Sequence, residues 1–167
     1  GLKKGRSFVT NGPLLFFRVN GHLPGSEQSL SEPGPVRVEV EAYSQVPMDR
    51  LDLIFNGKLI HTVKASGDST HLAYQAFIPI TGSGWLAARI SGGGHRLVVN
   101  NPDLFAHTTP IYLTVAGKPW ADADSVLHFL RWIQQLRLRL LTQGLFEQPI
   151  QKQQILEQFR QAETVYQ

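Results

Sequence analysis

Histidine and nearby carboxylate residues are the side chains best suited to chemistry in this chain. Its six histidines occur singly, without a His-x-His or His-Glu-x-x-His pattern. His61 and His71 flank a polar segment that contains Asp68. Imidazole nitrogen and carboxylate oxygen atoms bind zinc in many proteins, so these three residues form a weak candidate metal site. The simpler interpretation is that the two histidines merely border a loop between adjacent strands.

His107 and Thr108 form a second candidate site, because they lie in a polar segment with a proline just before a predicted strand. In a functional interpretation they face a neighbouring domain and contact it or its substrate. In a structural interpretation their hydrogen bonds hold the entry to the strand, and the proline ends the turn. We favour the structural interpretation. Arg6 and Asn11 are further candidates for substrate or interdomain contact.

Nucleophilic and phosphate-binding chemistry finds no support in the sequence. There is no Gly-x-Ser-x-Gly pattern, and the glycines at 92–94 are not followed by Lys-Ser/Thr. The chain has no cysteine, which excludes disulfides, thiolate catalysis and cysteine-ligated zinc. No residue is therefore predicted to be catalytic, and no cofactor is expected in this chain.

The composition is that of a globular chain. It has 167 residues, of which 42% are hydrophobic and 17% charged. No apolar run approaches the roughly 20 residues that a membrane span needs. The net charge of +3 is small. Arg131, Arg137 and Arg139 could form a basic stripe, but the solvated side of an amphipathic helix explains them more simply. We expect neither nucleic-acid binding nor a membrane span.

The first two thirds of the chain predict an antiparallel β-sandwich of immunoglobulin-like type. Short apolar or alternating runs are separated by Gly, Pro, Asn and Ser, as in such folds. The runs that predict strands are 14–19, 36–43, 51–55, 58–63, 72–78, 85–90, 95–100 and 111–115. Asn56 and Gly57 predict a type I′ hairpin turn, because that turn needs positive φ twice. Residues 1–118 are assigned to the sandwich.

The hydrophobic period changes after residue 118, which predicts two C-terminal helices in residues 119–167. Asp122 or Asp124 can cap the first helix, which is expected to end near Gly144. The second helix is expected to follow Pro149. Both helices are amphipathic and need a surface to cover, either each other and the sandwich or a further domain.

The pattern Gly-Arg-x-Phe-Val-Thr-x-Gly-Pro at residues 5–13 resembles the closing motif of the catalytic domain in PHP-type metal-dependent hydrolases of the CehA/McbA-like branch. Further matches follow in that family's order at 19–21, 24–25, 49–51, 56–57, 85–89, 105–112, 129–133 and 162–166. The resemblance implies that residues 1–13 are the tail of a preceding catalytic domain, and that the rest is its C-terminal sandwich.

Several expectations depend on this resemblance. The chain would be a non-catalytic accessory domain that packs on its own N-terminal catalytic barrel and shapes one wall of the substrate cleft. The parent would hydrolyse an ester or phosphoester with a metal-activated water, its divalent metal lying in the catalytic domain. The resemblance also implies a periplasmic or extracellular location. A homo-oligomer is a further possible assembly.

The alternative is an autonomous binding module for carbohydrate or protein. β-Sandwiches can bind sugars by stacking them on exposed aromatic rings, and the tryptophans are Trp85, Trp120 and Trp132. Their positions in the sequence favour core or interface roles over a sugar platform. An accessory domain should expose an apolar patch, whereas a binding module should have a rimmed groove with convergent polar groups.

Overall fold

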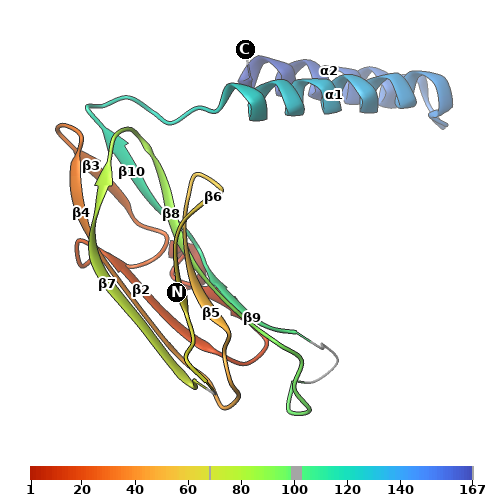
Figure 1. Ribbon diagram of the computed structural model, residues 1–167. Coiled ribbons are helices and arrows are strands. Elements are labelled where there is room, and N and C mark those ends of the chain that lie inside the picture. Colours follow the sequence, from red (N-terminus) through yellow and green to blue (C-terminus); the bar gives the residue numbers. More distant parts are fainter. Residues whose placement is uncertain (68, 99–102, 167) are drawn as a thin grey trace. The chain divides into compact units, whose positions relative to one another are not determined.

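The computed structural model describes residues 1–67, 69–98 and 103–166, and it divides the chain into two compact units (Figure 1). Gly1–Trp120 contains the strands, and Ala121–Gln167 contains the two helices. The strands form two sheets that enclose one hydrophobic core. The predictions of a mainly β, sandwich-like fold and of two C-terminal helices are confirmed.

One sheet has three antiparallel strands. Their order is β2 (Leu14–Val19), β4 (Gly34–Tyr43) and β7 (His71–Ile80). The alternation of side chains explains the sheet, because Val36, Val38 and Val40 face the core while Arg37 and Glu39 face outward. The outer face of this sheet combines such charged side chains with exposed apolar ones, among them Phe16 and Phe77.

The second sheet has seven strands and is centred on β8. Along one edge of β8 lie β5 and then β6, and along the other lie β9 and β10, which pair in turn with β1 and β3. The bounds are β1 Phe8–Thr10, β3 Glu27–Leu30, β5 Arg50–Phe55, β6 Lys58–Lys64, β8 Gly84–Gly92, β9 Leu104–Thr108 and β10 Ile111–Val115. All pairs are antiparallel except β10 with β3, which is parallel.

The core lies between the two sheets and is almost entirely aliphatic. Phe17, Met48, Leu53 and Ile90 are among its fully buried side chains. Two polar side chains among the described residues are also buried, Asp52 and Thr108, and both hydrogen-bond to neighbouring groups. Since buried polar groups are stable only when paired, these two residues mark positions where the sheet needs a specific side chain.

The predicted hairpin is confirmed. β5 and β6 pair with each other, and Asn56 and Gly57 between them have φ values of 50° and 78°. The Asn56 side chain also accepts a hydrogen bond from the Trp85 backbone N–H at 2.8 Å. The turn residue thus fixes both its own hairpin and the start of β8.

Three features of the sandwich differ from the sequence predictions. Residues 95–98 form a turn, so the strand predicted at 95–100 is wrong in its described part, while residues 99 and 100 lie outside the described residues. β8 instead continues to Gly92. His107 lies within a strand, β9, and Thr109 and Pro110 form the break between β9 and β10. β3 is polar and lacks clear alternation, which is why its sequence did not indicate a strand.

The helical unit contains α1 (Ala123–Gln143) and α2 (Pro149–Val165). Asp122 caps α1, because its carboxylate accepts a hydrogen bond from the Ser125 backbone N–H at 3.1 Å. Gly144 is the residue that follows the helix, as predicted. Within the described residues, neither helix combines the length and the apolar character that crossing a membrane requires.

Candidate functional site

A depression of about 600 Å³ lies on the outer face of the seven-stranded sheet. We call it the Ala87 depression. It is lined by Ile54, Trp85, Ala87, Ala88, Arg89, His107, Thr108, Pro110, Tyr112 and Trp120. It therefore contains His107 and Thr108, two of the residues selected from the sequence.

Strand register explains why these residues meet. Trp85 on β8 lies opposite Tyr112 on β10, and Arg89 on β8 lies opposite His107 on β9. Ala87 stands between Trp85 and Arg89 on the same face of β8. Because its side chain is a single methyl group, the larger neighbours on either side form walls around it. The depression is thus a consequence of one small residue in a row of large ones.

Aromatic rings dominate the walls. Tyr112 and Trp120 are 45% and 43% exposed, and Trp85 is half-buried. Such partly exposed rings offer large apolar contact area at a low cost in conformational entropy, and they are enriched at binding surfaces. The depression can therefore hold an apolar or ring-shaped group of a ligand or partner.

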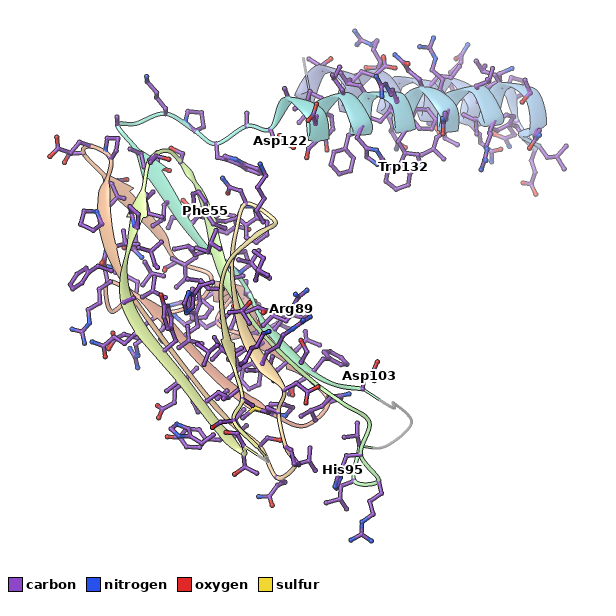
Figure 2. All side chains as sticks on the ribbon, in the orientation of Figure 1. Phe55, Arg89, His95, Asp103, Asp122 and Trp132 are labelled. Atoms are coloured by element: carbon purple, nitrogen blue, oxygen red, sulfur yellow. The ribbon has the colours of Figure 1, made fainter. Side chains whose placement is uncertain are left out.

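Arg89 is held in place by the buried carboxylate of Asp52. Its Nη2 and Nε atoms donate to Asp52 Oδ2 at 2.7 Å and 3.2 Å, and Thr62 donates to Asp52 Oδ1 at 2.8 Å. Arg50 lies 3.3 Å from the same carboxylate. Burial by itself raises the pKa of Asp52, but the hydrogen bonds from Arg89 and Thr62 and the positive charges of Arg89 and Arg50 outweigh it, so the pKa is lowered. Figure 2 labels Arg89 on the sandwich.

Thr108 has a structural contact, whereas His107 is exposed. The Thr108 hydroxyl accepts a hydrogen bond from the Ala88 backbone N–H at 3.1 Å. At Ala88 the pairing partner of β8 changes from β9 to β10, because Thr109 and Pro110 interrupt the long strand. The Thr108 side chain thus replaces the missing ladder bond. The imidazole of His107, on the outer face, remains open to a partner.

Replacing Thr108 with valine is expected to lower the free energy of unfolding by about 1–3 kcal/mol, because the buried Ala88 N–H loses its acceptor while side-chain volume is retained. Chemical denaturation of the variant measures this loss. Thr114→Val serves as the control, since the Thr114 hydroxyl makes no hydrogen bond among the described residues and its loss should cost little. Equal destabilisation by both variants would contradict this role of Thr108.

Asn11 and Arg6 lie apart from the depression. The Asn11 side chain bridges to the start of β9, since it donates to the Asp103 carbonyl at 2.7 Å and accepts from the Phe105 N–H at 2.8 Å. Arg6 is exposed and borders a different cavity of about 350 Å³, which lies beside β2. The structure therefore brings together His107 and Thr108 but not Arg6 or Asn11.

His61 and His71 lie on opposite sides of the three-stranded sheet. His61 on β6 stacks on Tyr74 with a centroid distance of 4.1 Å, and Tyr74 belongs to the inward set of β7. His71 faces outward from the same strand, stacks on Tyr43 and lies 3.1 Å from Glu41. Asp68 lies outside the described residues. Within the described part of the chain, no group of three His, Asp or Glu side chains is arranged to hold a metal ion.

A smaller depression of about 390 Å³ lies on the outer face of the three-stranded sheet. Its two carboxylates already have partners, because Glu39 pairs with Arg37 and Glu41 hydrogen-bonds with Tyr43 and His71. The hydrogen bond from Tyr43, and then that from His71, lowers the pKa of Glu41. This face is less suited to a ligand than the Ala87 depression, because both of its carboxylates are already paired.

The sequence did not indicate the aromatic walls of the site. Trp85, Tyr112 and Trp120 belong to three separate segments, and Trp85 and Trp120 were expected to serve as core or interface residues. Alternation along β8 could have indicated part of the site. Trp85, Ala87 and Arg89 are alternate residues of this strand, so they lie on the face opposite to the buried Leu86 and Ala88.

Comparison with known proteins identifies no relative. No family model matches the sequence, and no curated protein or solved structure shows significant similarity to it.

Proposed function

We propose that this chain is a non-catalytic accessory domain that docks a partner protein domain in the Ala87 depression. The observation that carries the proposal is the presence of two tryptophans, a tyrosine and an arginine around one cavity of about 600 Å³. Trp, Tyr and Arg are the residue types that contribute most to the energy of protein interfaces. The surface is thus suited to receiving an apolar anchor from a partner.

The polar groups of the depression favour a protein partner over a small polar ligand. Arg89 is committed to Asp52, and the Thr108 hydroxyl to the Ala88 N–H. Among the described residues, the polar groups of the lining that remain are His107, the Tyr112 hydroxyl and the indole N–H groups of Trp85 and Trp120, each set among apolar ring surface. Small-molecule sites usually have several convergent polar groups, whereas protein interfaces combine an apolar centre with a polar rim.

The partner in this proposal is a PHP-type catalytic domain attached ahead of residue 1. The motif at residues 5–13 supports it, together with the place of β1, where Val9 lies opposite His107. A domain joined through residues 1–7 would start near this face, and the covalent link would give it a high effective concentration there. The parent would use a metal-activated water, but the described residues offer no group that fits such a metal, so no step of hydrolysis is assigned to this chain.

An immunoglobulin-like topology forms part of the proposal. It is supported by the order β2-β4-β7 in one sheet and β6-β5-β8 followed by β9 and β10 in the other. The chain crosses between the sheets from β4 to β5, from β6 to β7 and from β7 to β8, as in Greek-key sandwiches.

The catalytic part of the proposal is tested by comparing this chain with a protein extended through the upstream coding region. Metal content and hydrolysis of chromogenic phosphate and carboxylate esters are measured for both. We expect only the longer protein to bind a divalent metal and turn over substrate. Turnover by this chain alone would overturn the accessory role.

The docking surface is tested in the longer protein with Trp85→Ala. We expect a protease to cleave the link between the domains about tenfold faster. Losing an interface tryptophan weakens the docking of the two domains by at least about 1.4 kcal/mol, which raises the undocked fraction about tenfold. Phe77→Ala is the matched control, since Phe77 is 69% exposed on the other sheet. Equal effects of the two variants, or none from Trp85→Ala, would place the interface elsewhere.

A carbohydrate-binding module is the second candidate, because Trp85, Tyr112 and Trp120 line the same depression and sugars stack on such rings. Titration of the chain with soluble glucan, mannan and chitin oligosaccharides, followed by tryptophan fluorescence, distinguishes the two. Saturable quenching that Trp120→Ala abolishes would favour the sugar module over the docking domain.

A further inference from the structure

β2 forms one edge of the three-stranded sheet, since among the described strands it pairs only with β4. Its register is unbroken from Leu14, opposite Tyr43, to Val19, opposite Val38. The Val19 N–H donates to the His22 carbonyl at 3.1 Å, and the Val19 carbonyl accepts from the His22 N–H at 2.9 Å. The backbone groups of Val19 therefore point away from β4.

Alternation along the strand extends this orientation to Leu15 and Phe17. In an antiparallel pair, every second residue directs its N–H and C=O toward the neighbouring strand, and the residues between direct theirs to the other side. Leu15 and Phe17 lie four and two residues before Val19, so their backbone groups also face the free edge. Among the described residues, no group hydrogen-bonds with them there. The edge thus offers two donors and two acceptors to a further chain.

This edge has little of the protection that usually keeps a strand from pairing with another chain. Prolines, bulges and charged side chains are the common means. β2 contains no proline, its pairing with β4 has no bulge, and Arg18 is its one charged residue, whereas β7 at the other edge of the sheet contains Pro79. Leu14 and Phe16 are each 52% exposed beside the free edge. The edge is therefore suited to pairing with a further strand.

A cavity of about 350 Å³ lies along the edge. Residues 15–18 of β2 line it, and Phe8, Leu23 and Pro24 add apolar surface from segments outside the sheet. The side chains of Leu15 and Phe17 are themselves buried. The unpaired backbone groups thus adjoin apolar surface, where a polar group without a hydrogen-bond partner is costly.

The spacing of these groups selects an extended chain as the occupant. They recur every second residue, which is a repeat of about 7 Å along the strand. The backbone of another β-strand presents acceptors and donors at the same repeat. In such strand addition the main-chain hydrogen bonds supply affinity, and alternate side chains supply specificity.

The charges of the cavity select an acidic segment. Arg6 and Arg18 both line it, and neither forms an ion pair among the described residues. The carboxylates of Glu39 and Glu41, opposite Arg18 and Phe16 on β4, are paired with other groups of the same sheet. A carboxylate of an incoming segment would therefore find two guanidinium groups available for charge-assisted hydrogen bonds.

A second copy of β2 matches the edge less well. Two-fold pairing would bring both copies of Arg6 and Arg18 to one interface, and the carboxylates that line the cavity are already paired. Like charges at an interface oppose association, and the chain already carries a net charge of +3. An acidic segment meets no such repulsion.

We propose that the free edge of β2 binds an extended acidic segment of another protein, which adds a strand to the three-stranded sheet. The segment pairs with the backbone of Leu15 and Phe17, and its alternate side chains place apolar groups in the cavity and carboxylates near Arg6 and Arg18. This inference does not depend on the docking role of the Ala87 depression, because the two cavities share no lining residue.

The test is an NMR titration of the full chain with a capped seven-residue peptide in which valine and glutamate alternate. We expect saturable shifts that are largest at the amides of residues 14–19, and slower hydrogen exchange at the Leu15 and Phe17 amides. A peptide with lysine in place of glutamate should bind at least about tenfold more weakly, because its charges would face Arg6 and Arg18. Equal binding of both peptides, or no binding of the acidic one, would overturn the proposal.

N-methylation of the acidic peptide tests the strand pairing itself. One version is methylated on the valine amides and another on the glutamate amides. In an added strand only one of these sets faces β2, so one version should lose at least about tenfold in affinity while the other retains most of it. Equal losses in the two versions would contradict strand addition.

Arg18→Glu tests the charge from the side of the protein. It should weaken binding of the acidic peptide at least about tenfold. Lys64→Glu is the matched control, because Lys64 is exposed on β6 of the other sheet and the substitution changes the net charge equally. Equal effects of the two variants would place the peptide elsewhere. Sedimentation velocity that shows a dimer of the chain, dissociated by the peptide, would assign the edge to a second copy and overturn the proposal.

Discussion

Replacing Asp52 with asparagine is expected to lower the free energy of unfolding at neutral pH by about 2–3 kcal/mol. Removing one partner of a buried ion pair costs about 3–5 kcal/mol, because the other charge is left unpaired. The cost here is smaller, since the side chains of Arg50 and Arg89 are 50% and 44% exposed and remain hydrated. Urea unfolding at pH 7 measures the difference.

The same variant should change how stability depends on pH. The pKa of Asp52 is lower in the folded state than in the unfolded chain, so its contribution is present above the unfolded pKa of about 3.9. That contribution is lost as the pH falls toward the lower pKa of the folded state. The stabilities of the wild type and Asp52→Asn should therefore converge in acid.

Unfolding at pH 7 and at pH 3 tests this convergence. Asp49→Asn is the control, because Asp49 is exposed and the substitution changes the net charge equally. A constant gap between the wild type and Asp52→Asn at both pH values would mean that the carboxylate stabilises the fold by packing and not by its charge.

Replacing Gly25 with alanine is expected to cost about 2–3 kcal/mol and to loosen the N-terminal segment. Gly25 has a φ of +78°, and an added Cβ would lie 2.4 Å from the Lys4 carbonyl oxygen and 2.6 Å from the Gly5 Cα. These atoms belong to the backbone, so no side-chain rotation relieves the contact. The 3₁₀ turn Leu2–Lys4 must move, and β1 beside His107 moves with it.

Gly21→Ala is the control for backbone strain alone. Gly21 has a φ of +79° but no atom within 4 Å of an added Cβ, so its replacement should cost only the about 1–2 kcal/mol of the left-handed conformation. Denaturation gives both costs, and hydrogen exchange at residues 7–10 reports the loosening. Equal costs and equal exchange in the two variants would show that the contact with Lys4 is unimportant.

The site was only partly predictable from the sequence. His107 and Thr108 were selected because a polar segment with a proline precedes a strand, and both line the Ala87 depression. Pro110 was interpreted as closing a turn before the strand, but β9 already pairs with β8 upstream of it. The pairing continues because the Thr108 hydroxyl supplies the acceptor that the interrupted ladder lacks. A side chain that replaces a backbone bond leaves no periodic signal in the sequence.

The sequence by itself determined the local structure. Alternation defined strands such as β4 and β10, the pair Asn56 and Gly57 determined the β5–β6 hairpin, and Gly144 marked the end of α1, whose cap the sequence narrowed to Asp122 or Asp124. Each depends on residues close together in the chain, because backbone conformation and side-chain period are local properties.

Only the tertiary structure decided which residues share a surface. Trp85 and Tyr112 meet because β8 pairs with β10, and Asp52 is buried because β5 lies between β6 and β8. His61 and His71 are separated because β7 directs His71 to the outer face of its sheet and Tyr74, on which His61 stacks, to the inner face. Strand register follows from the burial of the whole core, so a local pattern of residues does not contain it.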